Sequence, residues 1–249
     1  MLDPIVLVAL GGAGLLAGFV DAIAGGGGMI ALPALLAAGV PPVAALGTNK
    51  LQSVIGTGAA AITYWRKGFV DPKTIVFAIA CTFAAAFVGA FVVKQIDTSL
   101  LQVAVPVALI AIALYFLFAP RLSDADRHAR LRFGVFVPVM GAVIGFYDGI
   151  FGPGTGSFLT IGFVGLFGLG LTRASGHTKA LNLASNFGAL ALFIPSGDIV
   201  WPAAIAMAVG QIVGGYLGAL TGIRFGAKLI RPLVVVISIA LAIKLLFFR

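Results

Sequence analysis

The chain contains several long apolar runs that are separated by short basic segments. Examples are residues 75–93, 100–119 and 232–246. Each run holds about 15–20 residues with almost no charge, close to the roughly 20 that an α-helix needs to cross a hydrocarbon core. The alternating segments of an outer-membrane barrel are not found. The runs therefore predict an all-α polytopic membrane protein.

Composition supports lipid as the solvent of this chain. Hydrophobic residues make up 61% of the 249 positions and charged residues only 10%, against about a quarter charged in soluble domains. The net charge of +8 comes from basic residues in short segments between apolar runs, as in cytoplasmic loops. We therefore expect a lipid bilayer as surroundings and no nucleic-acid partner. Residues 1–4 lack a basic n-region, so the first run is expected to be a mature helix.

An internal repeat divides the chain into two halves. Three segments recur in the same order at offsets of 126 to 129 residues: 18–28 recurs as 145–156, 45–50 as 174–179, and 106–121 as 232–249. The repeat predicts a first transmembrane unit at 1–120, a basic linker at 121–132 and a second unit at 133–249.

Each half is predicted to hold five helical elements. They are expected near 5–23, 27–39, 43–65, 73–93 and 99–119, and again near 133–151, 156–170, 172–194, 199–222 and 229–248. The second element of each half spans roughly 20 Å at 1.5 Å per residue, too short to cross a bilayer upright. These two are interpreted as short or half-membrane helices that follow glycine-rich breaks.

Loop charges predict that the two halves are inverted relative to each other. In the first half the basic residues follow the third element, and in the second half they follow the fourth; they are Arg66, Lys67 and Lys73, and then Arg224, Lys228 and Arg231. The linker carries four arginines against two aspartates and is expected to be cytoplasmic. Inverted repeats are common among secondary transporters. The expected location is the bacterial inner membrane, with both termini in the periplasm.

The glycine-rich breaks are the first candidate binding feature. Four glycines occupy 25–28, and Gly-Pro-Gly-Thr-Gly occupies 152–156. Unwound backbone at membrane depth needs burial or a wet cavity, and a helix N-terminus with convergent N–H groups attracts anions. Inverted repeats would aim two such ends at the midplane. The alternative is tight helix packing through small residues.

Charges within the predicted membrane segments, at matching positions of the two halves, are the second feature. Asp21 matches Asp148, and Lys50 matches Lys179. A charge at bilayer depth costs at least ~2.5 kcal/mol and normally faces the interior or a cavity. The lysines are expected to attract an anion. The aspartates are interpreted either as partners of the lysines in the empty site or as carriers of a coupling proton. The structural alternatives are plain ion pairs or helix-end groups at the membrane interface.

Polar neighbours complete the predicted site. The predicted substrate-binding residues are Gly25, Gly26, Gly27, Gly28, Thr48, Asn49, Lys50, Gly154, Thr155, Gly156, His177, Thr178 and Lys179. Secondary polar residues are Gln52, Asn182 and Asn186; for the asparagines, a bond to a neighbouring helix is the favoured interpretation. With an ordinary pKa of ~6.5, His177 could relay a proton or simply form a hydrogen bond.

Small residues recur every four positions in the fourth elements. They are Gly210, Gly214, Gly218 and Gly222 in the second half, and Cys81, Ala85 and Gly89 in the first. Such a stripe allows close helix approach, within one chain or between two copies in a homodimer.

Signals of an enzyme are missing from the sequence. There is no G-x-S-x-G elbow, P-loop or H-E-x-x-H motif, and the chain has one cysteine, Cys81, and two histidines. We therefore expect a protein that is not an enzyme and holds no metal or cofactor.

The segments 18–28, 48–52 and 145–157 together resemble the TauE/SafE family of sulfite and sulfonate exporters, in particular its bacterial YfcA-like members. The resemblance covers essentially the whole chain, including the linker. It implies export of a small sulfur-containing anion such as sulfite, sulfoacetate or another organosulfonate, by alternating access, with the coupling ion open between proton and sodium. A passive anion channel and a membrane subunit of a larger complex are the alternatives.

Overall fold

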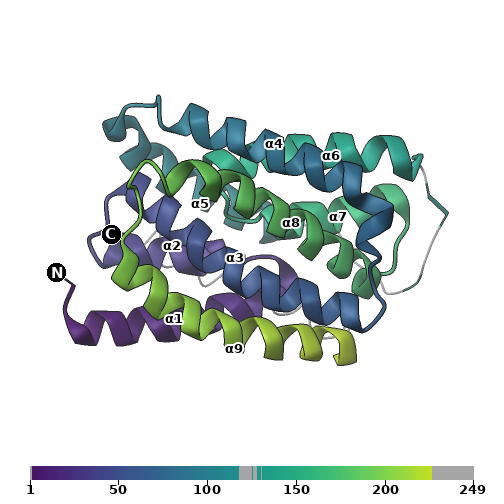
Figure 1. Cartoon of the computed structure of the whole chain (residues 1–249), viewed down its shortest axis with the longest axis horizontal. Coiled ribbons are helices and arrows are strands. Elements are labelled where there is room, and N and C mark those ends of the chain that lie inside the picture. The colour runs from purple at the N-terminus through teal and green to yellow at the C-terminus, as the bar shows by residue number, and fades with distance from the viewer. Residues whose placement is uncertain (1, 118–124, 126–127, 130, 226–249) are drawn as a thin grey trace.

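The structure is a computed structural model that describes residues 2–117, 125, 128–129 and 131–225. Within these residues nine α-helices and one short 3-10 turn follow one another (Figure 1). They are α1 (Pro4–Ala24), α2 (Gly28–Ala37), α3 (Pro42–Arg66), η1 (Pro72–Ile75), α4 (Val76–Val93), α5 (Thr98–Leu117), α6 (Phe133–Ile150), α7 (Thr155–Phe167), α8 (Leu171–Phe193) and α9 (Trp201–Phe225). The predicted all-helical class is confirmed. The element predicted at 229–248 lies outside the described residues.

Among the described residues, four helices are long and apolar enough to cross a membrane: α1, α4 with its preceding turn, α6 and α9. Two others, α3 and α8, are 25 and 23 residues long, but they carry most of the buried polar side chains and are therefore less apolar. The short helices α2 and α7 have 10 and 13 residues. At 1.5 Å per residue they reach only about 15 and 20 Å, so the prediction of short second elements is confirmed.

Glycines make the chain turn before each short helix. Gly25 ends α1 in the left-handed region with φ 77°, and its N–H donates to the carbonyl of Asp21. Before α7, Gly152 and Gly154 have φ values of 91° and 79°. Residues with a side chain rarely adopt these angles, so the glycine-rich breaks fix where α1 ends and where α7 begins.

Eight of the nine described helices pack in two matched groups, and α5 contacts α3. The first bundle contains α1, α2, α3 and α9, and the second contains α6, α7, α8 and α4. Figure 1 shows α1 beside α9 along one long side, α4 beside α6 along the other, and α3 and α8 between them. The first helix of each half thus packs on the fourth helix of the other half. The halves are interleaved in space, although they follow each other in the sequence.

The glycine stripe of α9 serves contacts within the chain. A Cβ atom on Gly210 would lie 2.2 Å from the carbonyl oxygen of Gly11, and one on Gly214 would lie 2.1 Å from that of Leu15. In the second bundle a Cβ atom on Gly89 would lie 2.2 Å from the carbonyl oxygen of Phe146. The stripes therefore let α9 approach α1, and α4 approach α6, backbone to backbone.

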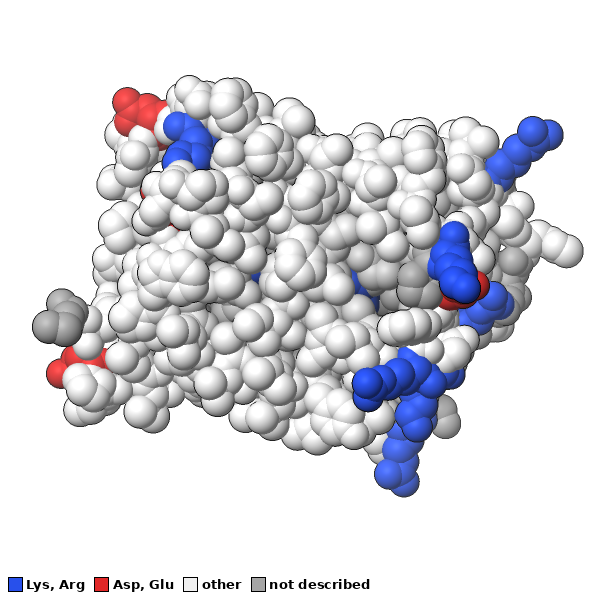
Figure 2. Space-filling view, viewed as in Figure 1, with Lys and Arg blue, Asp and Glu red and all other residues white. Residues whose placement is uncertain are grey.

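Charge is segregated between the two ends of the molecule. Figure 2 shows the blue side chains gathered mainly at one end, with some red among them, and red side chains with some blue at the other end. The basic end is where α3 and α9 finish, at Arg66 and just after Arg224, and where α6 begins after Arg132. The N-terminus lies at the opposite end (Figure 1). This is the distribution that the loop charges predict; the side of the membrane remains a prediction.

Candidate functional site

The two glycine-rich breaks meet inside the molecule. The N–H of Ser157 donates to the carbonyl oxygen of Gly25 at 3.3 Å. A Cβ atom on Gly25 would lie 2.2 Å from the carbonyl carbon of Gly156, and one on Gly156 would lie 2.5 Å from Cα of Gly25. These distances leave no room for a side chain. The packing interpretation therefore holds for these two glycines, and their contact joins the breaks of the two halves.

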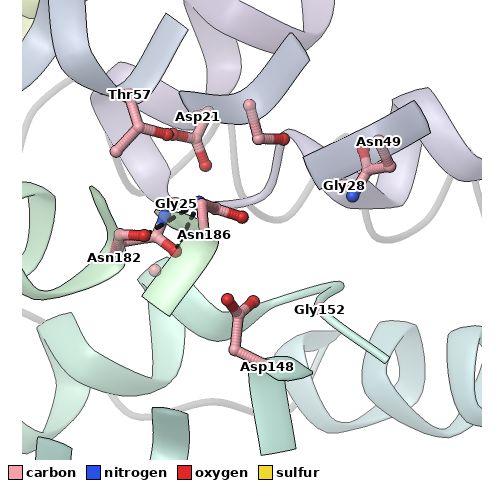
Figure 3. A pocket seen from close by; sticks show the side chains of 11 residues that line it. Asp21, Gly25, Gly28, Asn49, Thr57, Asp148, Gly152, Asn182 and Asn186 are labelled. Carbon is pink, nitrogen blue, oxygen red and sulfur yellow. Dashed lines mark hydrogen bonds between the residues drawn. The ribbon is translucent and has the colours of Figure 1, made fainter. Parts of the chain in front are cut away.

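A small polar cavity lies beside this contact. About 10 Å³ is open to the centre of a water molecule, which is room for about one water. The lining residues come from both halves; they are Asp21, Gly25, Gly28, Asn49, Ser53, Thr57, Asp148, Gly152, Gly156, Asn182 and Asn186. In Figure 3 the side chains of Asp21 and Asp148 enter from opposite sides.

Two buried ion pairs flank the cavity, and both connect the two halves. Nζ of Lys50 lies 2.8 Å from Oδ2 of Asp148, and Nζ of Lys179 lies 3.1 Å from Oδ2 of Asp21. Both lysine side chains are 1% exposed. Burying an ion is so costly that each charge needs its partner. Because α3 and α1 belong to the first bundle and α6 and α8 to the second, both pairs also bridge the bundles.

Each carboxylate also lies at the start of a short helix. Asp148 accepts a hydrogen bond from the Thr155 hydroxyl at 2.7 Å, at the beginning of α7. Asp21 accepts from the Gly27 N–H at 3.4 Å, just before α2, and from the Thr57 hydroxyl at 3.3 Å. A helix N-terminus and a lysine are the two groups that the sequence assigns to an anion. In this structure the aspartate carboxylates occupy that place.

The two lysines differ in how well they are held. Lys179 donates to the backbone carbonyl of Asp21 as well as to its carboxylate. Lys50 and Asp148 are in contact as ions, but Nζ of Lys50 and Oδ2 of Asp148 make no well-oriented hydrogen bond. A Cβ atom on Gly152 would lie 2.9 Å from Nζ of Lys50, so the glycine makes room for this ammonium group.

Most of the residues predicted from the sequence come together here. Those that line the cavity are Asp21, Gly25, Gly28, Asn49, Asp148, Gly156, Asn182 and Asn186. Four more contact the two carboxylates: Lys50, Lys179, Gly27 and Thr155. The Gln52 amide donates to Asn49 at 2.7 Å. Asn186 bonds Asn182 on its own helix while both line the cavity.

Other predicted residues make their contacts elsewhere. His177 packs on two phenylalanine rings, and its Nδ1 lies 2.9 Å from the carbonyl oxygen of Arg173. The Thr178 hydroxyl lies 3.1 Å from that of Thr160, and the Thr48 hydroxyl accepts from the Val200 N–H at 2.9 Å. Gly26 and Gly154 are not among the cavity-lining residues. Successive helix residues point about 100° apart, so neighbours of a lysine that faces the site need not face it.

Two lining residues, Ser53 and Thr57, were missed from the sequence, and Gly152 was recognised as part of a glycine-rich break but was not predicted to bind substrate. Ser53 and Thr57 are the repeat partners of Asn182 and Asn186, at the same offset of 129 that relates Lys50 to Lys179. They also follow Asn49 at spacings of four and eight, on one face of α3. The repeat and the helix period together carried the signal that would have identified them.

Comparison with known proteins gives consistent matches. Residues 10–245 match the family described as sulfite exporter TauE/SafE. A "probable membrane transporter protein ORF9" of Sinorhizobium sp is 47% identical, covering 94% of this chain and 90% of its own. The "probable membrane transporter protein YfcA" of Escherichia coli K12 is 42% identical over 99% of this chain and 92% of its own. A "probable membrane transporter protein" of Haemophilus influenzae is also 42% identical, over 94% and 92%. No solved structure matches.

Proposed function

The chain belongs to the sulfite exporter TauE/SafE family of membrane transporters, and we propose that it exports a small sulfur-containing anion. Sulfite, sulfoacetate or another organosulfonate is the proposed substrate. We propose that it works as a secondary transporter, by alternating access around the site between the two repeats. The family supports the substrate class, and the site supports the charge of the substrate.

The observation that carries the proposal is the pair of buried lysines. Lys50 and Lys179 converge from α3 and α8 on the place where both short helices begin. Ammonium groups and helix N-termini are favourable partners for an oxyanion that has lost its water. Asn49, Ser53 and Asn182 add hydroxyl and amide groups around the cavity. A pyramidal or tetrahedral oxyanion, with several acceptor oxygens, suits such a set.

The size of the cavity supports a carrier. With room for about one water molecule, it is too small for sulfite, which has four heavy atoms. Substrate must therefore enter a different conformation. Because both ion pairs bridge the two bundles, we propose that the bundles move relative to each other when the pairs open, each bundle carrying the fourth helix of the other half.

The segregated charges support an orientation in the membrane. We propose that the basic end, with the helix ends at Arg66, Arg132 and Arg224, faces the cytoplasm of a bacterial inner membrane (Figure 2). The N-terminus would then be periplasmic. Five elements in each inverted half would bring the C-terminus to the same side.

Ligand-induced stabilisation tests the proposed substrate class. Purified protein would be heated with sulfite, sulfoacetate, taurine, sulfate, lactate or chloride. We expect the sulfur-containing anions to raise the melting temperature of wild type, because a ligand that binds the native state stabilises it. Lys50→Ala and Lys179→Ala should lose this shift. Lys94→Ala is the matched control, since Lys94 also pairs with an aspartate, Asp198, but at the partly exposed rim.

The outcomes separate the substrate from the site. If no sulfur-containing anion stabilises wild type, the substrate class is wrong. If Lys50→Ala and Lys179→Ala respond as wild type does, the site is wrong. Counterflow in proteoliposomes distinguishes a carrier from a channel: unlabelled substrate inside should drive transient accumulation of labelled substrate, which a channel does not support.

A further inference from the structure

We propose that Asp21 and Asp148 bind the coupling protons, so that one proton accompanies each negative charge of the transported anion. The inference rests on the proposed function and identifies its coupling ion. A monovalent sulfonate would take one proton to an aspartate, and divalent sulfite would take two. Net flux would then follow the combined gradients of anion and proton, outward whenever the anion has accumulated sufficiently inside.

The argument starts from what the carboxylates do in this structure. Each one forms an ion pair with the lysine of the other half. Each also accepts a hydrogen bond at the start of a short helix, from Thr155 or from Gly27. These are the donors that an incoming anion needs. A bound oxyanion and an ionised aspartate therefore compete for the same ammonium group, and the anion gains the lysine only when the aspartate gives it up.

Charge balance then requires a proton. In the described state two ammonium groups and two carboxylates cancel, all of them in side chains that are buried or nearly so. An added anion would leave an uncompensated negative charge in a buried site, which is strongly unfavourable. Protonation of one aspartate per negative charge restores neutrality. It also removes the carboxylate's attraction for the lysine.

The surroundings favour a proton over sodium. Oδ2 of each aspartate lies within 3.1 Å of an ammonium group, and a sodium ion at that oxygen would be repelled by this charge. Oδ1 of Asp148 already accepts from Thr155. A proton needs no coordination shell. The cavity touches both aspartates and has room for about one water molecule, which can deliver a proton to either one.

The helices packed around α1 and α6 hold other charged or titratable groups, and three of these make the following contacts. Tyr64 donates to the carbonyl of Ala22, Tyr147 to that of Pro153, and the His177 ring packs on two phenylalanines. The remaining groups on these helices and on η1 are Arg66, Lys73, Cys81, Arg173, Tyr216 and Arg224. The cations in contact with the two carboxylates are Lys50 and Lys179.

The test uses methanesulfonate, a probe whose single charge does not change with pH, unlike that of sulfite. Its dissociation constant for purified wild-type protein would be measured between about pH 6 and pH 8. We expect binding to weaken about tenfold for each pH unit of increase, because the uptake of one proton with each bound anion makes the dissociation constant depend on the proton concentration. In weakly buffered solution, binding should take up about one proton per anion.

Variants assign this proton to a residue. Asp148→Asn should bind methanesulfonate with the same affinity across the pH range, because its amide cannot titrate. Asp198→Asn is the matched control: Asp198 is also paired with a lysine of the other half, but it lies away from the cavity, so the tenfold dependence should persist. If Asp148→Asn does not fold, the proton uptake of wild type still shows whether anion binding is coupled to a proton.

Each failure points to a different claim. If wild type binds methanesulfonate equally well at every pH and takes up no proton, the coupling inference is wrong while the anion site stands. If neither methanesulfonate nor sulfite binds at any pH, the proposed substrate class fails and the inference fails with it.

Discussion

The two buried ion pairs are copies of one arrangement, yet they are not equally secure. Lys179 is held by the carboxylate and the backbone carbonyl of Asp21. Among the described residues, Lys50 is in contact with the carboxylate of Asp148 and makes no well-oriented hydrogen bond. The carboxylate of the less well held lysine is nevertheless the more buried one: the side chain of Asp148 is 2% exposed and that of Asp21 is 12% exposed.

This difference indicates that the two matching lysines have different roles. The carbonyl of Asp21 lies in the last turn of α1, so Lys179 fastens the end of that helix whatever the state of the carboxylate. Lys50 has no such backbone bond among its described contacts, and it loses its partner when Asp148 is protonated or removed. We therefore expect Lys50 to be the lysine that is released to a substrate first.

Removing each carboxylate in turn gives the largest expected effect. Asp148→Ala leaves Lys50 buried without a counter-charge and should lower the free energy of unfolding by about 3–5 kcal/mol. Asp21→Ala leaves Lys179 its backbone carbonyl and should cost less, about 1–3 kcal/mol. Chemical denaturation in detergent near pH 8, followed by tryptophan fluorescence or circular dichroism, measures both.

A double variant shows whether unpaired charge is the cause. Combining Lys50→Met with Asp148→Leu removes both ions and should recover most of the stability lost in Asp148→Ala, because apolar residues of similar size often replace a buried pair without loss. The same double variant should bind no sulfonate. Equal losses in Asp148→Ala and Asp21→Ala would contradict the difference between the two pairs.

The threonines that support the carboxylates should show a smaller difference in the same direction. Thr155→Val removes a hydroxyl that lies 2.7 Å from Asp148 and 2.8 Å from the carbonyl oxygen of Gly152, and it should cost about 1.5–3 kcal/mol, as expected for a hydrogen bond to a charged group. Thr57→Val removes a bond of 3.3 Å to Asp21, which keeps Lys179 and the Gly27 N–H, so about 0.5–1 kcal/mol is expected.

The control for these variants is Thr221→Val. Its hydroxyl bonds the carbonyl of Leu217 on the exposed face of α9, and its loss should change stability little. The comparison fails if Thr57→Val proves as costly as Thr155→Val.

Much of the fold could be predicted because its signals are local. Clustered glycines mark the breaks before α2 and α7, and the charges at Asp21, Lys50, Asp148 and Lys179 stand out in apolar runs. The interleaving could not be predicted. A repeat shows that two lysines match and two aspartates match, but not whether Lys50 pairs with Asp21 of its own half or with Asp148. Long-range packing of α1 on α9 and of α6 on α4 decides that.

The residues that line the cavity were predicted to a similar extent and for similar reasons. Thr48-Asn49-Lys50 and His177-Thr178-Lys179 were each taken as a block, whereas the helix turns about 100° per residue and directs Thr48, His177 and Thr178 elsewhere. In the other direction, the repeat offset applied to Asn182 and Asn186 would have added Ser53 and Thr57. A repeat is thus more informative when every polar position is carried across it.

The smallest effect is expected at the exposed pair, which provides the reference for both buried ones. Lys94 and Asp198 lie 2.7 Å apart, and each side chain is 27% exposed. Solvent and salt screen such pairs, so Asp198→Asn should cost only about 0.2–1 kcal/mol, and less at high salt. Denaturation of Asp198→Asn beside Asp148→Ala measures the contrast, and equal losses would mean that burial is not what makes the inner pairs important.

The pH dependence of this exposed pair has a defined sign. Partial burial alone would raise the pKa of Asp198, but hydrogen bonds from Lys94 and Ser196 and the charge of Lys94 outweigh it, and the pKa is lowered. A carboxylate whose pKa is lowered by folding stabilises the native state at pH values above its pKa in the unfolded chain, about 3.9. This contribution is lost as the pH falls through its pKa in the native state. Asp198→Asn should therefore lose the same small amount at pH 6 and at pH 8, and match wild type only in strong acid. A loss that changed between pH 6 and pH 8 would show that Asp198 is coupled to the aspartates of the cavity, and the exposed pair would cease to be an independent reference.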